Sequence, residues 1–143
     1  LNGEDDYAAA GQIAYLSAGG VDNAALVVNV DGAGLSGVPV AFSFYGDGYV
    51  VGAAQDAFGR GLVDAWARDS LIEGPPWIEG DHSLFTQVGV PAVAVTSADL
   101  EAVKNLAHTE GDSPDKADPS LLAAAARMVA LIVTARPAGS PGE

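Results

Sequence analysis

Short apolar runs with the composition of strands alternate along this chain with segments whose apolar residues recur every three or four positions. The runs AALVVNVDG and VPAVAVTS have a pattern typical of strands buried on both faces of a sheet. VPVAFSFYG alternates well enough for another strand. Together they predict an α/β fold, a three-layer sandwich with a mostly parallel mixed sheet. The predicted strands, all in one sheet, are Ala25 to Asp31, Val38 to Tyr45 and Pro91 to Ser97.

Four segments have the patterns of helices. Val50 to Arg68 repeats its apolar residues at helical spacing, although two glycines oppose a continuous helix. Asp118 and Pro119 are the N-cap and first-turn pair that begins the last helix, which carries one wide apolar face. The other predicted segments are a helix from Tyr7 to Ala18, a short helix from His82 to Val88 capped by Asp81, and a loop at IEGPPWIEGD.

Length and composition limit the class of protein. With 143 residues, 49% of them hydrophobic, the chain can bury one ordinary core. We expect an α/β domain over residues 1–136, incomplete at its N-terminus, and a flexible tail over 137–143. The formal charge of −13 repels phosphate backbones and anionic lipid, which argues against nucleic acid and membrane partners. No apolar run reaches the ~20 residues that span a bilayer.

Three polar clusters are candidates for a site: the acidic residues Glu4 to Asp6, the strand-end residue Asp31, and His108 in a polar loop. Each has an ordinary interpretation as a charged turn, an aspartate turn before glycines, or a solvated histidine. Ligands of α/β sheets bind beyond the carboxyl ends of the strands, and this rule makes the three clusters candidate neighbours. Because the chain has no cysteine, carboxylates and imidazoles would have to hold any metal.

The same clusters carry a family resemblance that extends over the whole chain. The segments are GEDD, VNVDGAG, GDHSLFTQVGVPAVAV and AHTEGDSPDKAD, in that order. With them the chain resembles the C-terminal half of the catalytic domain of co-catalytic two-zinc exopeptidases, the family of bacterial leucyl aminopeptidases and aminopeptidase Y. The resemblance implies the zinc exopeptidase fold.

The resemblance also implies a function, a zinc-dependent aminopeptidase that hydrolyses N-terminal residues from peptides through a zinc-activated water. By similarity, Glu4 would be the general base that takes a proton from that water. Asp5 and His108 would bind one zinc ion and Asp31 the other, so the complete domain would hold two. The resemblance implies that Asp81, His82 and Asp112 are structural positions or lie behind the ligands and orient them.

The chain also departs from the family pattern. It lacks the upstream half, which supplies a His-x-Asp motif and a bridging aspartate, so that missing half is a possible partner of the chain. Gly80 replaces the usual serine, and Ala107 stands where some members carry a tyrosine. The acidic cluster is one residue longer than usual, so the pair of base and ligand could be Asp5 and Asp6 instead of Glu4 and Asp5.

Two other functions stay open at the level of sequence. A glutaminyl cyclase uses a similar scaffold with one zinc ion, and a non-catalytic binding or scaffold domain can have the same fold. The sequence does not determine the compartment, although a secreted or cell-envelope location is favoured over the cytoplasm.

Overall fold

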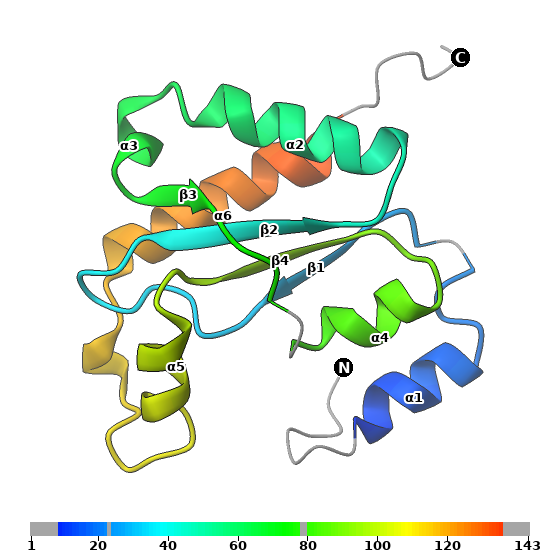
Figure 1. Cartoon of the computed structure of the whole chain (residues 1–143), viewed down its shortest axis with the longest axis horizontal. Coiled ribbons are helices and arrows are strands. Elements are labelled where there is room, and N and C mark those ends of the chain that lie inside the picture. Colours follow the sequence, from blue (N-terminus) through cyan, green and yellow to red (C-terminus); the bar gives the residue numbers. More distant parts are fainter. Residues whose placement is uncertain (1–8, 23, 78–79, 136–143) are drawn as a thin grey trace.

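An open sheet of four strands lies in the middle of the molecule, in the order β1-β4-β2-β3 (Figure 1). The computed structural model describes residues 9–22, 24–77 and 80–135. Two of the neighbouring pairs are parallel, β1 with β4 and β2 with β3, whereas β2 and β4 are antiparallel. The strands are β1 (Val27–Val30), β2 (Val40–Tyr45), β3 (Leu71–Glu73) and β4 (Ala92–Ser97).

Helices cover both faces of this sheet, which confirms the predicted three-layer α/β architecture (Figure 1). Helices α2 and α6 pack against each other on one face, with α3 beside them, and α4 and α1 lie on the other. The helices are α1 (Ala10–Ser17), α2 (Tyr49–Gly61), α3 (Ala65–Arg68), α4 (His82–Gln87), α5 (Leu100–Leu106) and α6 (Pro119–Thr134), with a 3-10 turn, η1 (Pro114–Lys116).

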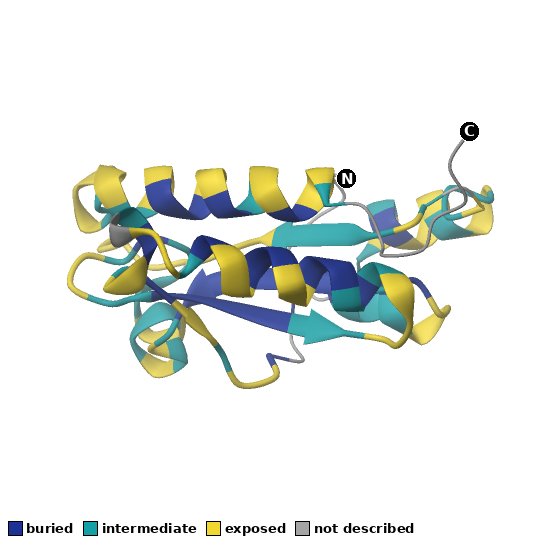
Figure 2. Cartoon of the chain, turned by 90° about the horizontal axis from the view of Figure 1, so that it is seen from above, coloured by how far each residue is buried: buried dark blue, intermediate teal, exposed yellow. Residues whose placement is uncertain are grey.

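The apolar core lies between the sheet and the pair α2 and α6 (Figure 2). Alternate residues of a strand point to the same face, so β2 and β4 each direct a row of apolar side chains toward these helices. The ring of Phe42 in β2 lies 5.1 Å from that of Phe58 in α2. The main members of this core are Val40, Phe42, Phe58, Val93, Val95, Met128 and Ile132.

The three predicted strands lie in one sheet, as expected, and α6 begins as predicted. The carboxylate of Asp118 caps α6 by accepting a hydrogen bond from the N–H of Ser120 at 2.7 Å. The short helix α4 is also confirmed, but Asp81 does not cap it through its side chain. Strand β3 was missed, since it overlaps the predicted loop and exposes two of its three residues.

The long helix predicted from Val50 to Arg68 is wrong, because the structure breaks it into α2 and α3. Helix α2 ends at Gly61, where a Cβ atom would lie 2.6 Å from the Cε of Met128 in α6. Glycine at this position therefore lets two helices approach closely. Of the described residues, no helix has the length and apolar character to cross a membrane.

The prediction that the first strand is buried on both faces is also wrong. Strand β1 is only half-buried, and Val30 at its end is 55% exposed. Within the described residues, β1 pairs with β4 alone and is an edge of the sheet. An apolar run predicts burial, but which strands lie at an edge depends on neighbours that the run itself does not specify.

Candidate functional site

Asp31 lies at the carboxyl edge of the sheet. Because β1 and β4 are parallel, both strands end at this edge. Asp31 follows β1 directly, and its N–H still donates to the carbonyl of Val95 in β4 at 3.0 Å. The ladder of hydrogen bonds therefore extends to Asp31, whose side chain is exposed. Sequence reasoning placed this residue at the end of a strand, and the structure agrees.

The loop that follows Asp31 is bound to the segment that leads into α6. The carbonyl of Gly34 accepts from the N–H of Asp118 at 2.8 Å, and the N–H of Ser36 donates to the carbonyl of Lys116 at 2.9 Å. Leu35 and Ala117 form an isolated antiparallel bridge between them. These contacts join two loops that are about eighty residues apart in the chain.

His108 follows α5, the helix that leaves the carboxyl end of β4. Its φ is 60°, a left-handed conformation that is unfavourable for a residue other than glycine. Thr109 stabilises this turn, since its hydroxyl donates to the carbonyl of Leu106 at 2.6 Å and accepts from the N–H of Gly111 at 3.2 Å. The imidazole of His108 is exposed, so the polar loop presents it to solvent.

Helix α5 connects the two candidate loops. Val103 of α5 packs directly against Gly32, because a Cβ atom on this glycine would lie 2.6 Å from the Cγ1 of Val103. Gly32 has a φ of 59°, which glycine adopts readily. Thus the turn after Asp31 contacts the helix whose end precedes His108. The structure places the backbones of both loops at the same end of the sheet (Figure 1).

The remaining predicted site residues, Glu4 and Asp5, lie outside the described residues. The convergence of Asp5, Asp31 and His108 on a two-metal centre therefore stays a prediction. Carboxylate and imidazole are suitable zinc ligands, and Asp31 and His108 supply one of each. In the part of the chain that the structure describes, no group of three histidine, aspartate or glutamate residues could hold a metal ion. The donor types suit zinc, but the described residues supply fewer than a site needs.

His82 has a structural environment and differs from His108. It is 1% exposed, and its Nε2 lies 2.7 Å from the carbonyl oxygen of Trp77. Since a carbonyl only accepts, Nε2 carries the proton in the neutral ring. Burial lowers the pKa of His82, although the Trp77 carbonyl and the charge of Asp81 oppose this shift. With the ring of Tyr45 at 4.6 Å, the neutral imidazole anchors the segment before α4.

Buried polar atoms cluster behind Asp31 on the α1 and α4 side of the sheet. Among the described residues, the Nδ2 of Asn29, the Nδ1 of His82 and the Oγ1 of Thr96 have no hydrogen-bond partner. A Cβ on Gly80 would lie 2.8 Å from the Asn29 Nδ2 and 2.7 Å from the His82 Nδ1. Sequence reasoning missed Thr96, whose only signal is a hydroxyl near the end of a buried strand.

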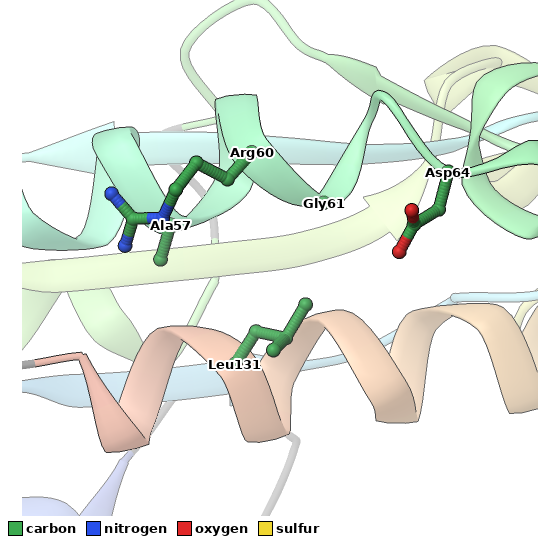
Figure 3. A pocket seen from close by; sticks show the side chains of 5 residues that line it. All are labelled: Ala57, Arg60, Gly61, Asp64 and Leu131. Atoms are coloured by element: carbon green, nitrogen blue, oxygen red, sulfur yellow. The ribbon is translucent and has the colours of Figure 1, made fainter.

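The described surface includes two hollows that can be compared with the predicted site. One, of about 190 Å³, lies between α2 and α6, where Leu131 faces Arg60 and Asp64 (Figure 3). It contains none of the predicted site residues. The other is an open groove of about 520 Å³ at the carboxyl end of β4. It is lined by Gly37, Val38, Pro39, Ala98, Asp99, Leu100 and Glu101.

The family model described as peptidase family M28 matches residues 1–133. No curated protein and no solved structure shows significant similarity to the chain.

Proposed function

The chain belongs to peptidase family M28, and from this membership we propose that it is part of a zinc-dependent aminopeptidase that removes N-terminal residues from peptides. The family supports the coarser statement, a function of the metallopeptidase type. One structural observation supports the finer proposal most. The loops of Asp31 and His108 lie at the same end of the sheet although they are far apart in sequence, and Val103 of α5, the helix before His108, packs against Gly32 of the Asp31 loop.

In the proposed site, Asp31, His108 and Asp5 hold the metal. Two zinc ions, when bound, supply Lewis acid chemistry for the scissile carbonyl. The carboxylate of Glu4 takes a proton from the attacking water and passes it to the leaving amine. The two hydrogen bonds of the Thr109 hydroxyl order the turn that carries His108, so this loop should rearrange little when His108 binds zinc.

We propose that a further part of the domain supplies the missing ligands by pairing with β1. Within the described residues, the outer edge of β1 has no strand beside it, and Val30 is 55% exposed. Such an edge offers unpaired backbone N–H and C=O groups to another strand. The strong acidic charge favours a peptide substrate over nucleic acid or anionic lipid as a partner.

A non-catalytic scaffold of the same fold is the second candidate. The observation that favours it is the lack of a group of three metal ligands among the described residues. This candidate predicts that adding the rest of the domain restores neither metal binding nor hydrolysis.

The test compares the 143-residue chain with a longer protein that contains the rest of the domain. We expect little or no hydrolysis of aminoacyl amides by the chain alone, and hydrolysis by the longer protein that chelators abolish. In the longer protein, Glu4→Gln should keep zinc but lower kcat by ~100- to 10,000-fold, because an amide does not accept the proton of the water. The matched variant Asp5→Asn should lower zinc content.

Two results would change the proposal. If Asp5→Asn abolishes turnover with both metals bound while Glu4→Gln is fully active, base and ligand are Asp5 and Asp6. If the longer protein binds no zinc, the proposal of an aminopeptidase is wrong and the non-catalytic scaffold is the better candidate.

A further inference from the structure

Ser97, the last residue of β4, is a buried serine whose hydroxyl makes two hydrogen bonds to the loop that follows Asp31. It is 0% exposed. Its Oγ donates to the carbonyl of Gly32 at 2.8 Å and accepts from the N–H of Leu35 at 2.9 Å. The N–H of Ser97 also donates to the Gly32 carbonyl at 3.1 Å. The Ser97 side chain thus binds the loop at Gly32, before its turn, and at Leu35, after it.

The same residue is the point from which the chain leaves the sheet toward His108. Helix α5 begins three residues after Ser97 and ends two residues before His108. Val103 of this helix contacts Gly32, the residue whose carbonyl Ser97 binds. Ser97 therefore holds the Asp31 loop against the start of the segment that carries His108.

We propose that Ser97 is a positioning residue that fixes the Asp31 loop relative to the His108 loop, and that it thereby sets the spacing of the two metal ligands. The importance of this spacing for a metal rests on the proposed function. Groups that orient metal ligands through hydrogen bonds typically affect metal affinity by ~10- to 100-fold.

Removing the hydroxyl should loosen the loop without removing the strand. In Ser97→Ala the Gly32 carbonyl keeps the backbone N–H of residue 97, but the N–H of Leu35 loses its acceptor. The far side of the Asp31 turn then loses its side-chain bond to β4, while Gly34 and Ser36 stay bonded to the segment that leads into α6. Ser97→Thr keeps the hydroxyl and should therefore keep most of the order of the loop.

Ser43 offers a matched control. It is also a buried serine in the sheet, 3% exposed, and its hydroxyl donates to the carbonyl of Pro75 at 2.6 Å. It contacts neither candidate loop through this bond. Ser43→Ala should therefore lower stability as a lost buried hydrogen bond does, without changing the position of either loop.

The first measurement is the distance distribution between nitroxide labels on Ser36→Cys and Glu110→Cys in the 143-residue chain, which has no cysteine of its own. Both positions are exposed. We expect a narrow distribution in the parent chain, in Ser43→Ala and in Ser97→Thr, and a broader one in Ser97→Ala. Equal widths in Ser97→Ala and the parent chain, or a broad distribution in the parent, would overturn the proposal.

The second measurement is zinc affinity by calorimetry, in unlabelled forms of the longer protein that contains the rest of the domain. Ser97→Ala should raise the zinc dissociation constant by ~10- to 100-fold, whereas Ser43→Ala should leave it unchanged. If Ser97→Ala does not fold, the same measurement is made on Ser97→Cys, whose slightly larger thiol is a weaker hydrogen-bond donor and acceptor than the hydroxyl. Unchanged affinity would overturn the role of Ser97 in the metal site. If the unsubstituted longer protein binds no zinc while the 143-residue chain has a narrow distance distribution, the proposed function fails and the positioning of the loops by Ser97 is supported.

Discussion

The two faces of the same sheet differ in what they contribute. On the face toward α2 and α6, the strands present large apolar side chains that are fully buried, among them Phe42 and Val95. On the face toward α1 and α4, β2 and β4 present small or polar residues, including Ser43 and Thr96. Every described buried polar atom without a hydrogen-bond partner lies on this second side. The first face stabilises the domain by apolar packing, and the second carries the buried polar atoms next to the end of β1 and Asp31.

The largest expected effect comes from truncating the apolar face. Phe42→Ala should lower the free energy of unfolding by about 3–5 kcal/mol, because it removes a fully buried ring packed against Phe58. Its neighbour Ser43 points to the opposite face, and Ser43→Ala should cost only about 1 kcal/mol. Urea denaturation of both variants measures the difference. Equal losses would mean that the two faces do not differ as described.

The pH dependence of stability tests the buried polar groups on the face toward α1 and α4. Burial lowers the pKa of His82 below its ordinary value of 6.5. The unfolded chain therefore binds a proton more readily, so this contribution to stability is complete above about pH 6.5 and decreases as pH falls below that value. The slope is at most about 1.4 kcal/mol per pH unit.

Urea denaturation between pH 5 and 8 tests this effect. His82→Gln should remove the part of the slope that is due to His82. An unchanged slope in His82→Gln would show that the imidazole is not held neutral by burial.

The smallest effect is expected at Thr96. Its hydroxyl is buried without a partner among the described residues, so Thr96→Val should leave stability unchanged or raise it by about 1 kcal/mol. Thermal unfolding of the variant measures this change. A loss of more than about 1 kcal/mol would mean that the hydroxyl makes a hydrogen bond in solution.

Local patterns in the sequence predict much of this fold. The strands and α6 follow from short apolar runs, from periodicity and from the Asp118 and Pro119 pair, all of which act within a few residues. The close approach of Gly61, at the end of α2, to Met128 is a contact between helices far apart in sequence, which no local pattern predicts. The exposed edge of β1 likewise depends on the neighbours of the strand.

The candidate site divides in the same way. Asp31 and His108 follow predicted elements, so the sequence can place them near the carboxyl edge of the sheet. The role of Ser97 is not visible in the sequence, because its hydrogen bond to Leu35 joins residues 62 positions apart. The neutral state of His82 cannot be predicted from the sequence either, because it depends on the burial of the imidazole in the folded chain.

The zinc content of two histidine variants tests the central claim most directly, that the exposed histidine binds metal and the buried one supports the fold. In the longer protein that contains the rest of the domain, His108→Ala should lose zinc while its unfolding temperature stays close to that of the parent. His82→Gln should keep zinc and unfold at a lower temperature. Full zinc occupancy in His108→Ala, or loss of zinc in a stably folded His82→Gln, would contradict the account.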